Sequence, residues 1–357
     1  MNAGQALSTF KLPNEGPTRG DAYLQSLLAI IRYAGRPLEY DFLAGVTGDA
    51  FRATTWDAHR CCEWDTQPRM RQLKYLEEAL GLQWEPIWPP YLPEAAPQPL
   101  VLSGTGMSPT DPGSDEPLFL YDRAYPTWHD DLMVKVKDAI ERGYPVLVRG
   151  TWQGVTTHQW GCLVGWNQAN DQFYGVLPGN KLYLDGLPEL AVYIKGLADA
   201  PIQPARIFPE SLRRAAMEKS PLDYPVTPNA RTRTMYDIWI DRLFAPPQHA
   251  TCGEEPWQCH WRLATTTRDA RLAAQGFLRS ARPYLPVKAL SALEELDRCY
   301  AQVTRTFTRD TDPRYVQFAY GLVDEQYEMA DRIALVQRYE RHARQALRNL
   351  ALQLDAE

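Results

Sequence analysis

The feature that most constrains the fold is a run of short strand-like segments between residues 145 and 195, with helical patterns before and after it. Gly, Asn and Asp turn residues separate the segments, which is typical of an antiparallel meander. We expect about five strands, the usual size of a sheet. Because helices precede the meander and do not alternate with strands, the pattern predicts an α+β fold. The expected strands cover 145–149, 159–166, 172–176, 181–184 and 191–195.

Helical signals lie on both sides of this meander. Asp21 is a good N-cap for a first helix that starts at Ala22 and ends at Gly35. A short second helix is expected over 38–44, ending at Gly45. After about residue 206 the pattern is helical throughout, and the expected helices cover 210–219, 231–244, 257–280, 289–307 and 314–352.

A chain of 357 residues is long enough for two domains. We expect an N-terminal extension over 1–15, an α+β domain over 16–205 and an all-helical domain over 206–357. Prolines crowd residues 85–128, so this part is predicted to be an insertion without long helices.

Charge and composition exclude several classes of protein. The formal charge is −6, so nothing indicates a nucleic-acid partner. No stretch of 18 apolar residues and no signal peptide is present, so we expect no membrane partner. Irregular cysteine spacing favours reduced thiols and a cytoplasmic location. The six cysteines are Cys61, Cys62, Cys162, Cys252, Cys259 and Cys299.

The order of elements suggests where chemistry would take place. A nucleophile at a helix N-terminus gains a lowered pKa from the free amides of the first turn. A histidine at the start of a strand can lie opposite such a helix and act as a base. Position 22 begins the first expected helix, and His158 stands at the start of an expected strand. The spacing between the two positions is in the range of papain-type pairs.

Two runs of residues carry a resemblance to a known family. The run Gly20-Asp-Ala-Tyr-Leu-Gln-Ser-Leu-Leu-Ala-Ile-Ile-Arg-Tyr-Ala-Gly35 resembles the nucleophile helix of double-glycine bacteriocin-processing peptidases. The run His158-Gln-Trp-Gly-Cys-Leu-Val-Gly-Trp166 is similar to the histidine strand of the same peptidases. The continuation from Tyr40 to Arg52 looks more like the N-terminal domain of butirosin biosynthesis protein H, whose group includes an acyltransferase. The resemblance implies a papain-like fold for residues 16–205.

The sequence departs from this family where catalysis would occur. Alignment on Gly35 puts Ala22 at the position of the catalytic cysteine. The family's Asp-Pro reads Leu177-Pro178 here, although Asn180 is close enough to act as the orienting residue instead. The family's glutamine upstream of the cysteine has no match. An engineered Cys-to-Ala change at position 22 would explain only the first departure.

Four residues are candidates for ligand binding, and each has a structural alternative. Asp21 is either an N-cap or a ligand contact, and Arg52 is either a salt-bridge residue or a clamp for a carboxylate or phosphate. Trp152 and Trp160 flank His158 and either line a binding site or pack in the core.

Evidence for metals and cofactors is weak. His249, Cys252, Cys259 and His260 lie close together, but their spacing matches no standard zinc finger. No Gly-rich phosphate loop and no Gly-x-Ser-x-Gly elbow occurs, so we expect no cofactor.

Three functions follow as hypotheses. The first is a catalytically degenerate papain-like protein that binds a peptide, a small-molecule amine or an acyl-carrier protein in the cleft between the first helix and the sheet, without turning it over. The second is an active acyltransferase or amidase, using a non-cysteine mechanism or seen as an engineered alanine variant. The third is a structural protein whose helical domain mediates assembly; the sequence does not set its oligomeric state.

Overall fold

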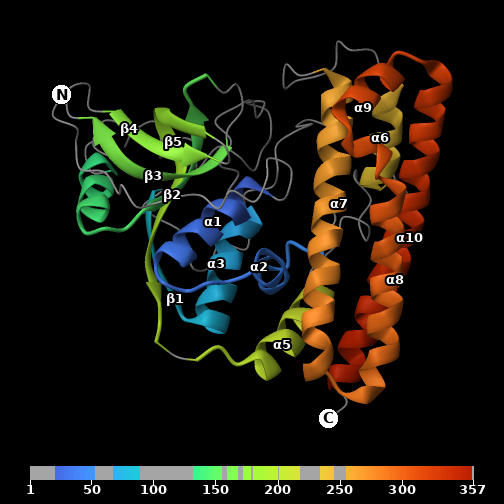
Figure 1. Cartoon of the computed structure of the whole chain (residues 1–357), viewed down its shortest axis with the longest axis horizontal. Coiled ribbons are helices and arrows are strands. Elements are labelled where there is room, and N and C mark those ends of the chain that lie inside the picture. The colour runs from blue at the N-terminus through green and yellow to red at the C-terminus, as the bar shows by residue number, and fades with distance from the viewer. Residues whose placement is uncertain are drawn as a thin grey trace, which may run out of the picture. The chain divides into compact units, whose positions relative to one another are not determined.

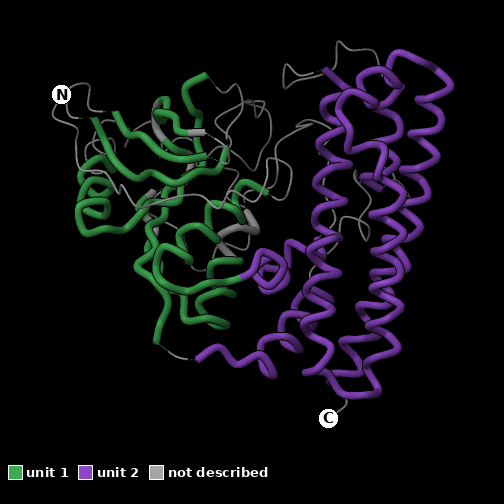
Figure 2. Tube along the Cα trace, viewed as in Figure 1, with its two compact units in different colours: residues 1–38, 66–200 green, residues 39–65, 201–357 purple. Residues whose placement is uncertain are grey.

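The computed structural model describes residues 21–52, 67–88, 132–154, 159–167, 172–177, 180–199, 201–217, 234–244 and 255–355 (Figure 1). The chain forms two compact units (Figure 2). Unit 1 comprises residues 1–38 and 66–200, and unit 2 comprises 39–65 and 201–357. The division near residue 200 agrees with the sequence-based boundary. Residues 39–65 were expected in the α+β domain, but in the structure they group with the helical unit.

Unit 1 is built on a five-stranded antiparallel sheet with the order β1-β5-β2-β3-β4. Its strands are β1 (Leu82–Trp88), β2 (Val146–Trp152), β3 (Gln159–Asn167), β4 (Gln172–Leu177) and β5 (Asn180–Leu197). β5 also pairs with β4, so β2, β3, β4 and β5 form a closed ring. The predicted α+β class and the meander are confirmed, and two expected strands prove to be the halves of β5.

Strand β1 was not predicted, because it enters the proline-rich region and contains Pro86. Proline cannot donate to a ladder, but an edge strand tolerates it. Among the described strands, β1 pairs with β5 alone and lies at one end of the strand order.

Helices cover both faces of the sheet. On one face, α1 (Ala22–Tyr33) packs against β3. On the other, a helix over residues 132–141 contributes Val136 and Ile140 to a core that includes Val148 and Leu163. The helix α3 (Gln67–Leu80) contacts β1 and ends at Gly81, which has a φ of 68°.

Unit 2 is helical. It contains α2 (Tyr40–Thr47), α5 (Pro204–Met217), α6 (Met235–Leu243), α7 (Pro256–Ala281), α8 (Leu290–Thr306), α9 (Pro313–Tyr320) and α10 (Val323–Asp355). The single helix expected over 314–352 is divided into α9 and α10 at Gly321 and Leu322. No helix in the described parts of the chain is long and apolar enough to span a membrane.

The end of α2 differs from the sequence prediction. Gly45 was expected to end the helix, but it lies inside α2. The position requires glycine because a Cβ there would come within 1.9 Å of the Phe277 ring. The helix instead ends at Gly48, whose φ of 83° is left-handed. Gly45 is therefore a close-packing residue and Gly48 is the helix terminator.

Candidate functional site

The first turn of α1 holds the candidate nucleophile position. Asp21 is the N-cap, and its carboxylate accepts a hydrogen bond of 2.7 Å from the backbone amide of Tyr23. The N-cap interpretation of Asp21 therefore agrees with the structure. Ala22 is the first helical residue and is half-buried. Its methyl side chain carries no atom that can attack a carbonyl.

This first turn packs beside the start of β3. The rings of Tyr23 and Trp160 meet edge to face, with centroids 4.8 Å apart. One helical turn further on, the Cys162 thiol lies 3.5 Å from the carbonyl oxygen of Ser26 and donates to it. Trp160 and Cys162 therefore face α1, as residues that alternate along one strand should.

His158 precedes β3 and lies outside the described residues. Its position next to Ala22 stays a prediction. Asn180 is the first residue of β5 and its backbone pairs with Leu177, but its side chain is also outside the described part.

Trp152 lies on the other face of the sheet and is completely buried. Its ring occupies space that only glycine leaves open, since a Cβ on Gly161 would come within 2.5 Å of it. The indole Nε1 donates to the carbonyl oxygen of Gln159 at 3.0 Å. The structure does not bring Trp152 and Trp160 to one site, and Trp152 has the packing role.

Arg52 belongs to unit 2 and not to the unit that contains Ala22. Its guanidinium lies 3.6 Å from the carboxylate of Asp49 within the same loop. The salt-bridge interpretation of Arg52 therefore agrees with the structure.

A buried thiol cannot replace the missing nucleophile in unit 1. Burial raises the pKa of Cys162 far above its usual range, so the thiol stays protonated. Cys162 is also fully buried and directed at a backbone carbonyl. The described cysteines Cys162, Cys259 and Cys299 form no disulfide and are all buried.

Ser26 is a polar residue four positions after Ala22 in α1. Residues four apart on a helix are neighbours, and the Cα–Cβ bond tilts toward the helix N-terminus. The Ser26 hydroxyl is buried and makes no hydrogen bond. An unpaired buried hydroxyl costs free energy, so it marks a place where a polar group can be accommodated. No sequence pattern singles out Ser26, because only its burial and its unpaired hydroxyl distinguish it from other serines.

Two of the zinc candidates are described, and both lie buried in α7. The Trp239 Nε1 donates to Nδ1 of His260 at 3.0 Å, and Nε2 of His260 lies 2.9 Å from Asp310. Both ring nitrogens of His260 are therefore occupied by protein partners. His249 and Cys252 lie outside the described residues, and the described ones form no group of three or more metal-ligand side chains.

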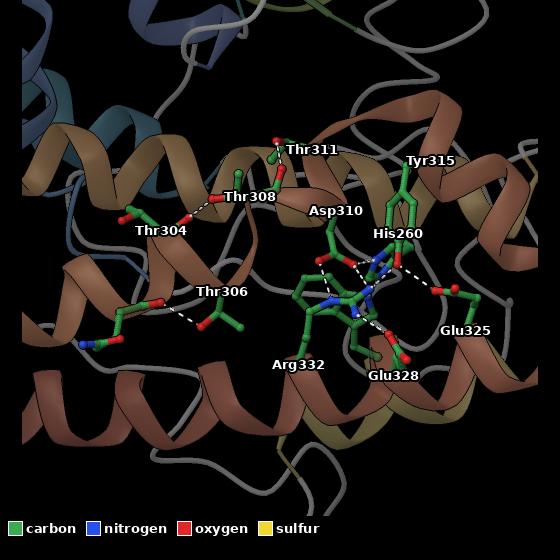
Figure 3. A network of polar contacts seen from close by, with 12 residues as sticks. His260, Thr304, Thr306, Thr308, Asp310, Thr311, Tyr315, Glu325, Glu328 and Arg332 are labelled. Carbon is green, nitrogen blue, oxygen red and sulfur yellow. Dashed lines mark hydrogen bonds and ion pairs between the residues drawn. The ribbon is translucent and has the colours of Figure 1, made fainter.

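His260 is part of a polar network that the sequence did not reveal (Figure 3). The indole N–H of Trp239 can only donate a hydrogen bond, so Nδ1 of His260 is the acceptor. The proton of His260 is therefore on Nε2, which donates to Asp310. Arg332 bonds the same carboxylate at 2.8 and 3.1 Å and also reaches the hydroxyl of Tyr315 at 3.1 Å. Although burial opposes ionisation, the hydrogen bonds from His260 and Arg332 hold the pKa of Asp310 below its usual value. The network joins helices, and the His260 and Asp310 side chains at its centre are completely buried.

A second buried ion pair holds α7 to α10. The Arg271 guanidinium bonds the Glu340 carboxylate at 2.6 and 2.8 Å and donates to the carbonyl oxygen of Ala50 at 2.6 Å. It also lies over the Tyr300 ring, 4.9 Å from its centroid. Both side chains are buried, so the pair is structural.

Comparison with known proteins does not assign the chain to a family. The chain matches no protein-family model, and no curated protein matches its sequence.

Proposed function

We propose that unit 1 is a catalytically degenerate papain-like domain, located in the cytoplasm, that binds a ligand at the N-terminal end of α1 without turning it over. The ligand is a peptide, an amine or an acyl group presented by a carrier protein. The observation that carries the proposal is Ala22, which is half-buried at a capped helix N-terminus beside the start of β3.

Three features support binding at this position. The amides of a first helical turn favour the partial negative charge of a carbonyl oxygen or carboxylate. The unpaired hydroxyl of Ser26 lies one turn further along the same helix. Asp21 takes the amide of Tyr23 and fixes the backbone of the turn, so the other first-turn amides are held in place before a ligand arrives.

The missing nucleophile separates this proposal from the enzymatic alternative. Acyl transfer by a thiol mechanism needs a thiolate next to a base, and position 22 offers a methyl group. Cys162 does not substitute for it, since its thiol is buried and directed away from the helix N-terminus, at Ser26. The active acyltransferase or amidase remains the alternative if Ala22 stands where the natural chain has cysteine.

Direct binding tests the proposal. The probes are a peptide ending in Gly-Gly, an aminoglycoside, and an acyl carrier protein with an acylated phosphopantetheine arm, each titrated calorimetrically. Ala22→Trp blocks the site, and Val134→Trp is the matched control on an exposed position of unit 1. We expect at least one probe to bind, with affinity lowered about tenfold or more by Ala22→Trp alone. Equal affinity in both variants, or no binding by any probe, would refute the proposal.

A further inference from the structure

Exposed apolar side chains gather at one end of unit 2. Phe318, Val323 and Tyr327 are 68%, 64% and 60% exposed, and Phe244 and Leu322 are also exposed. We call these five residues the α9–α10 patch. Single exposed apolar residues are ordinary on a protein surface, but a group of this size indicates an interaction site.

The patch residues lie on elements that meet at the same end of the unit. The rings of Phe244 and Tyr327 are 5.0 Å apart, which joins the end of α6 to the first turns of α10. Val323 and Tyr327 are four residues apart and share one face of α10. Phe318 lies in the last turn of α9, and Leu322 lies between α9 and α10. Figure 1 shows α6, α9 and the start of α10 together.

The base of the patch is fixed by polar contacts. The Tyr315 hydroxyl donates to Glu325 at 2.9 Å, and the Gln326 amide donates to the carbonyl oxygen of Tyr320 at 2.7 Å. Arg332 ties Tyr315 to Asp310 beneath them (Figure 3). A partner would therefore meet a surface that is already ordered, which lowers the entropic cost of binding.

An acidic row borders the apolar row along α10. Asp324, Glu328 and Asp331 follow one another at helical spacing, and all three are exposed. The Glu328 carboxylate lies 3.6 Å from Arg332, whose guanidinium is already shared with Asp310, so the row stays net negative. The patch therefore offers apolar contact area and negative charge side by side.

We propose that the α9–α10 patch binds a basic amphipathic helix of a protein partner. Apolar side chains of such a helix cover Val323 and Tyr327, and its Lys or Arg residues meet the acidic row. The same charge disfavours other occupants. A second copy related by two-fold symmetry would bring two acidic rows together, and an anionic lipid surface would be repelled. The proposal is independent of the ligand proposed for unit 1.

A designed peptide tests this surface in the intact chain. The probe is a fluorescent peptide of about 18 residues, with Leu at i, i+3, i+4 and i+7 and Lys elsewhere. One control peptide has the same composition with Leu scattered, and another has Glu in place of Lys. Fluorescence anisotropy at low and high salt gives the affinity and its charge dependence.

Matched variants locate the binding site. The double variant Val323→Ser with Tyr327→Ser removes the apolar row, and Val287→Ser with Leu352→Ser removes equally exposed apolar residues elsewhere in unit 2. Glu328→Gln with Asp331→Asn removes two charges from the row, and Glu294→Gln with Asp138→Asn removes two charges elsewhere. Circular dichroism confirms that each variant is folded.

We expect the basic amphipathic peptide to bind, and each patch variant to weaken binding about tenfold while its control leaves it unchanged. Binding should also fall at high salt. Equal binding of the scattered or acidic peptide, equal loss in the control variants, or no binding would overturn the proposal. Dimerisation through the patch in sedimentation, or its binding to anionic vesicles, would overturn it in favour of another occupant.

Discussion

Tyr23 and Trp160 pack edge to face, with ring centroids 4.8 Å apart and an interplanar angle of 68°. Tyr23 follows Ala22 directly, and Trp160 is two residues after His158. The contact therefore fixes the first turn of α1 against the start of β3, which are the two chain segments that carry the candidate site. Any function at Ala22 depends on this packing.

The aromatic contact should be essential for the stability of unit 1. Trp160→Ala leaves a cavity beneath α1 and is expected to lower the free energy of unfolding by about 3–4 kcal/mol. Tyr33→Ala removes a partly exposed ring at the far end of the same helix and should cost about 1 kcal/mol or less. Urea denaturation of both variants measures the difference. Equal losses would show that the Tyr23–Trp160 contact does not anchor α1.

Replacing Ser26 should stabilise unit 1 and weaken its ligand binding. Ser26→Ala removes an unpaired buried hydroxyl and improves helix propensity, so it is expected to raise the free energy of unfolding by about 0.5–1 kcal/mol. If the hydroxyl contacts the ligand, the same variant should bind the ligand of unit 1 more weakly. Thermal unfolding and calorimetry on one sample measure both effects. A loss of stability would mean that the hydroxyl has a partner in solution.

The Arg271–Glu340 pair should show strong coupling. Glu340→Leu leaves the buried Arg271 guanidinium without its carboxylate and is expected to cost about 3–5 kcal/mol. The double variant Arg271→Met with Glu340→Leu removes both charges and should recover most of that loss. Urea denaturation of Glu340→Leu, of Arg271→Met and of the double variant gives the coupling energy. Additive losses would contradict the interpretation of the pair as a buried unit.

Asp310 should make unit 2 sensitive to acid. Its pKa is lowered in the folded chain, so its contribution is present above the unfolded value of about 3.9 and is lost as pH falls through the lower folded pKa. Asp310→Asn should cost about 3 kcal/mol at neutral pH, and the difference from the parent chain should shrink below about pH 4. Hydrogen exchange of α7 and α10 at several pH values measures this. A difference independent of pH would contradict it.

The sequence predicted those parts of the fold that depend on local patterns. The N-cap at Asp21, the α1 helix and the antiparallel strands follow from spacing and turn residues, and the structure confirms them. The end of α2 was wrong, because Gly45 is required by its contact with Phe277, a residue distant in sequence.

The polar groups of the interior could not be predicted. His260 and Asp310 are 50 residues apart, and the Arg271–Glu340 pair spans 69. No local pattern links such residues. His260 was instead considered as a zinc ligand because Cys259 precedes it, and the structure shows that its ring nitrogens are already bound.

The reactivity of a cysteine placed at position 22 tests the central claim most directly. Ala22→Cys is labelled with iodoacetamide near neutral pH and followed by intact mass, beside a variant that also carries His158→Ala. The parent chain supplies the baseline for the native thiols. Its described cysteines should react slowly, since burial and Glu295 raise the pKa of Cys299 to about 11, and Cys162 and Cys259 are buried.

A degenerate binding domain predicts slow labelling at position 22 that His158→Ala leaves unchanged. Labelling about tenfold faster or more, and lost with His158→Ala, would show a functional cysteine–histidine pair. That result would contradict the binding-only account and favour an acyltransferase or amidase with its cysteine replaced.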